Sequence, residues 1–380
     1  MTLSAPSQEV TVKGYLAHNL GDDLFMDTLF RRYPDVRFTV VADEPYRFFE
    51  SRYGNVRLIP LGTAIPRRPL LGLMSRIGGV TVSPEVRLLL EDVHRTRNLV
   101  MIGGSMYQQQ RDEQLQKQIL FETRHLYKTP DHTFVIGANF GPYWAEDYRE
   151  AYRHIFTQYC DDVCFRDKWS KSQFPDVANI RTASDVLFAF PMPKLKKRKQ
   201  AFFSVCDLSL PGRPESLRSK ADEYEQWIAD IAEKLHAKGY SIVFGAFCTP
   251  ENDGAAIGRI QEMLRARGVN SENIIYQYDQ DPMVNAIASS EIVVATRFHA
   301  TILGLIAGSK VLPLIYNVKT DNMLNDIARN GIRRVDLLND MPKNWPHDAD
   351  EIIGLQPIDV SKQQRDAELQ FKALDDFLGR

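Results

Sequence analysis

The chain has 380 residues, which is too long for one small hydrophobic core and predicts two domains of ordinary size. Hydrophobic residues make up 44% of the sequence and charged residues 25%, as in soluble globular proteins. Because 47 lysines and arginines nearly balance 49 acids, the net charge of −2 excludes a general attraction to nucleic acid. Any anion site therefore has to be local.

The cysteines and the apolar runs bear on the cellular compartment. The sequence contains four cysteines, no paired CxxC spacing and no visible signal peptide. These features predict reduced thiols in the cytosol and no zinc or other metal site. No apolar run approaches the ~20 residues needed to span a bilayer. We therefore expect a cytoplasmic protein that contacts the inner face of a membrane peripherally at most.

Alternating strand-like and helix-like segments predict an α/β protein with parallel sheets. The first domain is expected over residues 1–190 and the second over residues 201–358. The strands expected in the first domain span residues 10–16, 37–42, 56–60, 99–102, 133–138 and 163–166. Residues 63–82 are rich in proline, glycine, leucine and arginine. We interpret them as a long excursion that packs on its own domain or contacts a lipid-linked substrate.

The loop NLGDD at residues 19–23 lies between the first expected strand and a helix that runs through Arg32. Gly21 permits a tight turn here, and Asn19 or Asp22 can cap the helix. The order of strand, loop and helix places all three residues at the carboxyl edge of the first strand. The loop is not a GxGxxG dinucleotide motif, so we infer no NAD.

Two later strand ends carry residues that suit a binding site. Gly104 and Ser105 follow the strand at 99–102, where glycine lets the backbone approach a ligand and serine can donate a hydrogen bond. Asn139 and Trp144 follow the strand at 133–138. The Trp144 ring either stacks on a sugar face or pins its own loop.

Residues 191–200, PMPKLKKRKQ, are interpreted as the domain linker. Prolines resist regular structure and like charges repel one another, which favours an extended, solvated segment. The alternative is attraction to an anionic lipid surface, at about 1 kcal/mol per basic residue near a membrane. Both interpretations leave the segment exposed.

The second domain repeats the alternation. Its expected elements are a strand at 202–206, a helix at 223–238, a strand at 240–244, a helix ending near 267 and further segments at 274–276 and 283–289. The loop AFCTPEND at 246–253 contains Glu251 and Asp253, which either bind acceptor hydroxyls or cap the following helix. Capping is the simpler explanation.

The turn TRFH follows a β-branched strand at 292–295 and precedes an apolar helix at 300–307. We expect Thr296 to be the N-cap, with Arg297 and His299 in or beside the first helical turn. Free backbone N–H groups and the helix dipole favour an anion there, and a forked guanidinium suits a carboxylate or phosphate. The alternatives are an ion pair of Arg297 with a structural acid and a hydrogen-bonded framework role for His299.

The chain after this turn supplies a further cation. An apolar strand is expected at 311–315, with Tyr316 and Lys319 on the loop behind it and a helix at 321–329. Lys319 would then face the same pocket as Arg297. The tail at 360–378 has apolar residues at helical spacing. We expect a terminal helix over 359–380 that packs back on the first domain.

The pattern RFHATILGLIAGSKVLPLIYNVK, with DNMLNDIA downstream, resembles the C-terminal signature of the polysaccharide pyruvyl transferase family. Further stretches agree in family order: NLGDD, IGGS, GANFGPYW, FRDKWS, ASDVLFAF and GAFCTPENDGAAI. The resemblance implies two Rossmann-like domains of GT-B type whose parallel sheets face a central cleft, with the acceptor on the N-terminal side and the donor on the C-terminal side.

The resemblance also implies the reaction: a pyruvyl group passes from phosphoenolpyruvate to two hydroxyls of a sugar and forms a cyclic ketal. Phosphoenolpyruvate is then a co-substrate, and no other cofactor is expected. The acceptor would be a sugar or lipid-linked oligosaccharide of an exopolysaccharide or lipopolysaccharide. Arg166, from FRDKWS, becomes a candidate second cation for the donor, with an ion pair to Asp167 or Asp185 as its structural alternative.

The candidate residues fall into three groups. The catalytic candidates are His299 and Arg297; the donor-binding candidates are Arg166, Arg297, Lys319 and Thr296; the acceptor or cleft candidates are Asn19, Asp22, Gly104, Ser105, Asn139 and Trp144. His299 is assigned general acid or base work. Two other functions stay open: a GT-B glycosyltransferase that uses a nucleotide sugar, and a non-catalytic sugar- or anion-binding homologue.

Overall fold

The computed structural model describes residues 8–64, 79–327 and 331–380. Contacts divide the chain into two compact units. Unit 1 comprises Met1–Leu16, Phe25–Val186 and Asp366–Arg380, and unit 2 comprises Ala17–Leu24 and Leu187–Arg365. The segment at 17–24, which lies within the first expected domain, belongs to unit 2.

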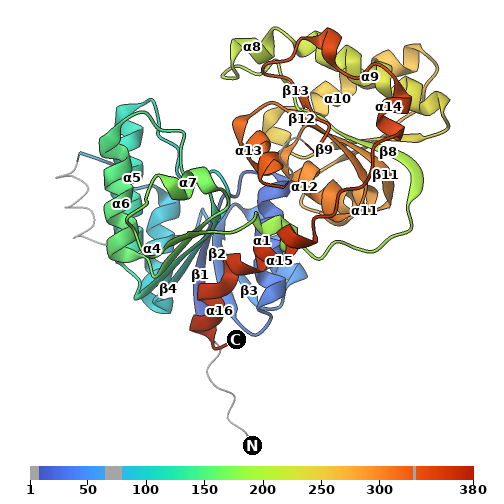
Figure 1. Cartoon of the computed structure of the whole chain (residues 1–380). Helices are drawn as coiled ribbons and strands as arrows, with labels where there is room; N and C mark the ends of the chain where they lie inside the picture. The colour runs from blue at the N-terminus through green and yellow to red at the C-terminus, as the bar shows by residue number, and fades with distance from the viewer. Residues whose placement is uncertain (1–7, 65–78, 328–330) are drawn as a thin grey trace, which may run out of the picture. The chain divides into compact units, whose positions relative to one another are not determined.

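Seven parallel strands among the described residues form the sheet of unit 1 (Figure 1). They are β1 (Glu9–Gly14), β2 (Arg37–Ala42), β3 (Val56–Pro60), β4 (Asn98–Ile102), β5 (His132–Ala138), β6 (Asp162–Phe165) and β7 (Ile180–Thr182). Their order is β3-β2-β1-β4-β5-β6-β7, which is the Rossmann order extended by one strand. The predicted strands of the first domain lie within two residues of β1 to β6, whereas the short β7 was missed.

Helices cover the faces of this sheet. They are α1 (Leu20–Arg32), α2 (Phe48–Arg52), α4 (Pro84–Thr96), α5 (Glu113–Lys128), α6 (Glu146–Tyr159), α7 (Lys168–Ser172) and α16 (Lys372–Leu378), with 3-10 turns η1 (Glu44–Arg47), η2 (Val186–Ala189) and η5 (Leu369–Phe371). Successive β5 residues point to opposite faces: Val135 joins the core under α4, α5 and α6, and the Phe134 ring centre lies 5.3 Å from that of Phe377 in α16, with the two rings tilted. Both faces of the sheet are therefore packed.

Six parallel strands within the described residues form the sheet of unit 2. They are β8 (Arg198–Ser204), β9 (Ser241–Ala246), β10 (Glu272–Ile275), β11 (Ser290–Ala295), β12 (Lys310–Ile315) and β13 (Val335–Asp336). The order β10-β9-β8-β11-β12-β13 repeats the order of the first six strands of unit 1. The prediction of two parallel-sheet α/β domains is confirmed.

The helices of unit 2 alternate with its strands. They are α8 (Glu215–Arg218), α9 (Ala221–Ala237), α10 (Asp253–Ala266), α11 (Asp281–Ser289), α12 (Phe298–Ile306), α13 (Val318–Ile327), α14 (Ala349–Ile353) and α15 (Ser361–Glu368), with 3-10 turns η3 (Thr249–Glu251) and η4 (Pro342–Asn344). Gly239, at φ +85°, follows the C-cap of α9. No helix in the described parts of the chain is long and apolar enough to span a membrane.

Three predicted segments differ from the structure. Strand β8 begins at Arg198, so the last residues of the expected linker are part of a sheet. The tail is not one helix, because η5 separates α15 from α16. Residues 65–78 of the expected excursion lie outside the described residues.

The last residues of the chain are tied to the sheet of unit 1 by one buried amide. Gln370 accepts a hydrogen bond from the Gly137 N–H at 2.9 Å. Its amide nitrogen donates to the carbonyl oxygens of Ala183 and Ser184, both at 3.0 Å. A single glutamine thereby satisfies backbone groups that the strand ends leave unpaired.

Candidate functional site

The site of unit 2 lies where its strand order reverses. Strands β8 and β11 are neighbours, and the chain leaves them toward opposite sides of the sheet. Ligands of open α/β sheets bind at such a point, beyond the carboxyl ends of the strands. Ser204 joins the two strand ends: its carbonyl accepts from Thr296 N at 3.0 Å, and its hydroxyl accepts from Arg297 N at 3.3 Å.

The TRFH turn is built differently from the prediction. Helix α12 begins at Phe298, and its N-cap is Arg297, which is extended (φ −73°, ψ 132°) and gives no side-chain cap. The expectation that Thr296 caps the helix is wrong, because the buried Thr296 hydroxyl lies 2.7 Å from the Tyr224 hydroxyl. His299 lies in the first turn of α12 and is half-buried.

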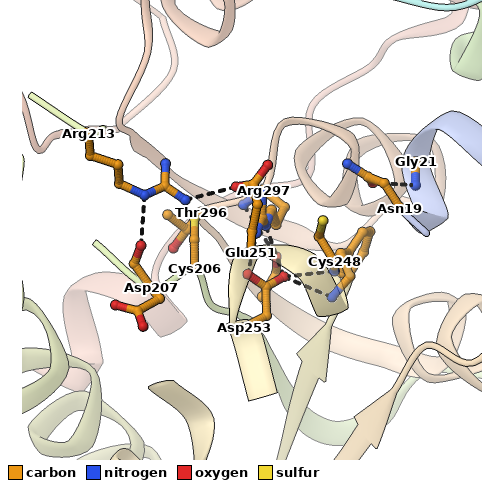
Figure 2. A network of polar contacts seen from close by, with 12 residues as sticks. Asn19, Gly21, Cys206, Asp207, Arg213, Cys248, Glu251, Asp253, Thr296 and Arg297 are labelled. Atoms are coloured by element: carbon orange, nitrogen blue, oxygen red, sulfur yellow. Dashed lines mark hydrogen bonds and ion pairs between the residues drawn. The ribbon is translucent and has the colours of Figure 1, made fainter. Parts of the chain in front are cut away.

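Arg297 is 4% exposed and is held by two acids (Figure 2). Its Nε donates to Asp253 Oδ2 at 2.9 Å, its Nη2 bonds Asp253 Oδ1, and its Nη1 donates to Glu251 Oε2 at 2.7 Å. The alternative interpretation, in which Arg297 forms an ion pair with a structural acid, is therefore confirmed. The interpretation of Glu251 and Asp253 as helix caps is wrong, because α10 has no side-chain cap.

The residue between the two acids has a left-handed backbone conformation. Asn252 separates η3 from α10 and has φ +54°, a left-handed conformation that asparagine tolerates better than most residues. Asp253 is fully buried, and its Oδ2 also accepts from the backbone N–H groups of Phe247 at 3.0 Å and Cys248 at 2.9 Å. Asp253 is therefore a fixed acceptor that orients the guanidinium.

Arg213 is a second cation of this site that the sequence interpretation missed. Its Nε donates to the carbonyl of Asp207 at 2.7 Å, and its Nη2 donates to Glu251 Oε2 at 2.8 Å. Its guanidinium carbon lies 5.2 Å from the centre of the Tyr316 ring. The sequence feature that could have identified Arg213 was its position after β8. Arg297 follows β11, and the strand order reverses between these two strands.

Burial and charge act in opposite directions on the ionisable groups here. Burial alone would raise the pKa of Glu251, but the positive charges of Arg297 and Arg213 outweigh it and hold that pKa below its ordinary value. Burial raises the pKa of the Cys206 thiol to about 12 and that of Cys248 to about 11. Both thiols are therefore protonated at neutral pH, and neither is a ready nucleophile.

The segment at residues 17–24 packs against the same edge of unit 2. The predicted loop at 19–23 is shorter than expected, because α1 already begins at Leu20. Asn19 Oδ1 accepts from Gly21 N at 3.0 Å, which confirms Asn19 as a cap of α1. Asn19 also pairs with Cys248 in an antiparallel bridge, and Leu20 N donates to the Phe247 carbonyl at 3.0 Å. The segment is thus bonded to the two residues whose amides hold Asp253.

Gly21 matters for a reason other than a tight turn. Its φ lies outside the left-handed region, so its backbone does not require glycine. A Cβ at this position would lie 1.7 Å from His299 Nδ1 and 2.5 Å from His299 Cγ. The imidazole therefore lies directly on the Gly21 backbone, and any side chain there would displace it. Asp22, the neighbouring candidate, is buried.

Lys319 does not lie on a loop as predicted. Helix α13 begins at Val318, and Lys319 is a half-buried residue of its first turn. Asn317 precedes the helix, and its Oδ1 accepts from Thr320 N at 3.1 Å. The loop behind β12 is therefore shorter than expected, and it retains Tyr316 but not Lys319.

Arg166 lies in unit 1 and is held by local partners. Its Nη1 donates to Asp185 Oδ2 at 2.8 Å, and its Nη2 donates to Asn139 Oδ1 at 2.9 Å. Both members of the ion pair are buried. Asp167 instead caps α7 by accepting from Ser170 N at 2.8 Å. The alternative of an ion pair with Asp185 is confirmed, and the one with Asp167 is not.

Gly104 makes room for Arg166. A Cβ at Gly104 would lie 2.4 Å from Arg166 Nη2, so the close approach predicted for a ligand is made by this guanidinium. Asn139 N donates to the Gly104 carbonyl at 2.7 Å, which joins the ends of β4 and β5. The structure thus brings Gly104, Asn139 and Arg166 together at the carboxyl edge of unit 1, with half-buried Ser105 beside Gly104 in the chain.

Trp144 and its neighbour Tyr143 behave differently. Trp144 is 59% exposed. Its backbone N–H donates a hydrogen bond to Gln109 Oε1 at 2.8 Å. Tyr143 donates its hydroxyl to Gln173 at 2.7 Å and thereby anchors the loop. The indole of Trp144 is left at the surface, where a sugar face can stack on it.

The described residues contain no group of three or more histidine, cysteine, aspartate or glutamate side chains that could hold a metal ion. The positive groups of the unit 2 site are instead guanidinium ions. The guanidinium groups of Arg213 and Arg297 can together hold an anion, and the imidazole of His299 lies in the adjacent helical turn.

Solved structures with a similar fold include HepE from Anabaena and two UDP-GlcNAc 2-epimerases. HepE from Anabaena, solved in complex with UDP and glucose, superposes with a TM-score of 0.56 and 8% identity, covering 98% of this chain and 100% of that chain. The UDP-GlcNAc 2-epimerase of Methanocaldococcus jannaschii gives a TM-score of 0.60 and 8% identity over 97% of this chain and 99% of that chain. At this identity the likeness shows the fold, which is the GT-B fold.

The UDP-GlcNAc 2-epimerase of Neisseria meningitidis, bound to UDP-GlcNAc, is similar as well, with a TM-score of 0.51 and 10% identity over 98% of this chain and 99% of that chain. A comparison with curated proteins finds no match. The family model of the polysaccharide pyruvyl transferases matches residues 19–318, which include both the Asn19 loop and the TRFH turn. This chain therefore belongs to the polysaccharide pyruvyl transferase family, a family of transferases.

Proposed function

We propose that this protein transfers the pyruvyl group of phosphoenolpyruvate to a sugar of a polysaccharide, or of its lipid-linked precursor, and forms a pyruvate ketal. The observation that carries the proposal is the convergence of Arg213 and Arg297 on one carboxylate oxygen, next to the helical turn that contains His299. Phosphoenolpyruvate is small and bears a phosphate and a carboxylate. It therefore needs several cations and offers little apolar area for binding.

The donor groups are assigned to unit 2. Arg297 and Arg213 supply forked donors to the phosphate or the carboxylate, and Lys319 is a third candidate cation. The positive end of the α12 helix dipole adds to their attraction for an anion. Thr296 contributes by fixing the turn through Tyr224 rather than by touching the donor. The contacts of Arg166 with Asp185 and Asn139 favour a framework role for that residue.

The reaction requires one proton transfer to carbon and two new carbon–oxygen bonds. A general acid protonates the methylene carbon of the donor, and an acceptor hydroxyl attacks the resulting oxocarbenium-like carbon and loses its proton. A second hydroxyl of the same sugar then displaces phosphate, which leaves with that hydroxyl's proton. His299 is the residue that we assign to proton transfer. The products are the cyclic ketal and inorganic phosphate.

The acceptor residues are assigned by their positions after β1, β4 and β5. In unit 2, Asn19 precedes α1 and Asp22 lies in its first turn; in unit 1, Ser105 follows β4 and Trp144 follows β5. An exposed indole suits the apolar face of a sugar, and short polar side chains suit its hydroxyls. Replacing Trp144 by alanine is expected to weaken acceptor use and leave donor binding unchanged.

A cytoplasmic location at the inner face of a membrane is the corresponding proposal for a lipid-linked acceptor. Lys194, Lys196 and Arg198 are exposed, as is Leu195 between them. Each basic residue near an anionic lipid surface contributes about 1 kcal/mol. Sedimentation with vesicles that contain anionic lipid, compared with neutral vesicles, tests this; equal sedimentation with both would contradict it.

The second candidate function is glycosyl transfer from a nucleotide sugar. It is favoured by the fold, which this chain shares with HepE in complex with UDP and glucose. Calorimetric titration of the purified protein separates the two candidates. Saturable binding of phosphoenolpyruvate without binding of UDP-sugars supports pyruvyl transfer, and the opposite pattern supports glycosyl transfer.

A further inference from the structure

The point of contact between the two arginines is one oxygen atom. Glu251 Oε2 accepts from Arg213 Nη2 at 2.8 Å and from Arg297 Nη1 at 2.7 Å. Arg213 comes from the segment behind β8, and Arg297 comes from the turn behind β11. Two forked cations that meet on a single anionic oxygen form the arrangement that a phosphate or carboxylate oxygen requires.

The two acids of the cluster are not equivalent. Asp253 is fully buried, binds two nitrogens of Arg297 and also accepts two backbone N–H groups. Glu251 has a side chain that is 42% exposed and meets the arginines through the edge of its carboxylate. Losing Asp253 would leave buried donors unpaired, whereas the Glu251 carboxylate can turn into water.

The arginines keep other contacts when Glu251 turns away. Arg297 is still fixed by Asp253, and Arg213 is still fixed by the Asp207 carbonyl and the Tyr316 ring. Glu251 is the last residue of the three-residue turn η3, so rotation of its side chain breaks no helix. The site therefore remains in place while its anionic ligand changes.

We propose that the Glu251 carboxylate is an exchangeable ligand of Arg213 and Arg297, and that an anionic group of the donor takes its place on both guanidinium groups. This inference rests on the proposed function for the identity of the anion. With Glu251 bound to the arginines, the two cations and the two acids cancel in charge. With Glu251 turned away, the cluster has one net positive charge, which attracts an anionic group of the donor.

The exchange has a consequence for turnover. Every anion that enters the site competes with an acid attached to the same chain, so binding is weaker than the two arginines alone would give. The competition applies to the phosphate product as well as to the donor. Glu251 therefore helps the phosphate product leave. Arg213, for which the donor and Glu251 compete, is a residue that determines donor affinity.

Calorimetric titrations of the full chain with inorganic phosphate and, separately, with phosphoenolpyruvate test the exchange. If Glu251 occupies the arginines about nine-tenths of the time, Glu251→Gln and Glu251→Ala will bind both anions about tenfold more tightly. The gain is expected to disappear in the double variant Glu251→Gln/Arg213→Gln. Two different substitutions at position 251 guard against a local packing effect of either one.

The matched control is Glu215→Gln. Glu215 lies in the same unit, forms an ion pair with Arg218 and loses the same charge on substitution. An equal gain in this control would show a general charge effect and would overturn the exchange. Unchanged or weaker phosphate binding in both Glu251 variants would also overturn it.

The two anions separate this inference from the proposed function. If wild type binds phosphoenolpyruvate and the Glu251 variants show no gain, the exchange fails and the donor assignment stands. If phosphate binding tightens in the variants but phosphoenolpyruvate never binds, the exchange stands and the donor assignment fails. If no variant binds either anion, both are wrong.

Discussion

Arg166 in unit 1 and Arg297 in unit 2 are similar at first sight and differ in one respect. Each follows a parallel strand, is buried and forms an ion pair with a buried aspartate, Asp185 or Asp253. The second partner of Arg166 is the buried amide of Asn139, whereas that of Arg297 is a partly exposed acid shared with Arg213. A buried arginine at a strand end is therefore weak evidence for anion binding. An exposed acid shared by two arginines is stronger evidence.

The largest expected effect is on stability, and it applies to both arginines. Arg166→Met and Arg297→Met each leave a buried carboxylate without its cation, which costs about 3–5 kcal/mol of unfolding free energy. Denaturant titration measures this loss. The double variants Arg166→Met/Asp185→Asn and Arg297→Met/Asp253→Asn are expected to recover part of it. A loss below about 1 kcal/mol, the range of exposed ion pairs, would contradict the description of either site.

The next largest effect is expected on kcat, and it concerns His299 of unit 2. His299→Ala is expected to lower kcat by about 10²–10⁴-fold, the usual contribution of a general acid or base, with little change in phosphoenolpyruvate affinity. Phosphate release in the presence of an acceptor sugar measures this. His236→Ala, at an exposed position on α9, is the control. Wild-type turnover in His299→Ala would rule out the proton-transfer role.

Gly21→Ala tests whether His299 is positioned by the first turn of α1. The added methyl group overlaps the imidazole, so kcat is expected to fall by about tenfold or more, because small displacements of catalytic groups are costly. Gly258→Ala, where an added Cβ meets nothing within 4 Å, is the matched control. If the two alanine variants keep equal activity, the contact between Gly21 and His299 has no catalytic importance.

A smaller effect is expected in the pH dependence of stability. The arginines hold the pKa of Glu251 below the ordinary value of 4.5 although burial opposes them. Its stabilisation is therefore present above that value and is lost as the pH falls through the lower pKa of the folded state. Wild type should exceed Glu251→Gln by at most about 1 kcal/mol at pH 7, because the side chain is partly exposed. A difference that persists unchanged at pH 3 would contradict this account.

The sheets of both units were predictable because their strands are short β-branched and apolar runs between helical segments. The first-domain strands agree within two residues from β1 to β6. The very short β7 and β13 were missed, because strands of three and two residues contain too little pattern. Strand β8 extends into a basic segment whose charges indicated a linker.

The candidate site was predictable in part. TRFH and the position of its strand end pointed to Arg297 and His299 without the structure. The pair of Arg297 with Asp253 was not predictable, because 44 residues separate them and an acid at a helix start resembles a cap. The left-handed conformation of Asn252, between the two acids, has no clear sequence signal. Arg213 belongs to no motif, and only the strand order brings it to Arg297.

Arg213 and Arg297 are proposed to form the anion site of the donor together. Calorimetric titration of phosphoenolpyruvate into wild type, Arg213→Gln and Arg218→Gln is the decisive test. Arg218 is the matched control, because it lies five positions along the same segment and pairs with Glu215. We predict that Arg213→Gln weakens binding by about tenfold, or about 1.4 kcal/mol, while Arg218→Gln changes it little. Equal affinity in all three proteins would contradict the claim.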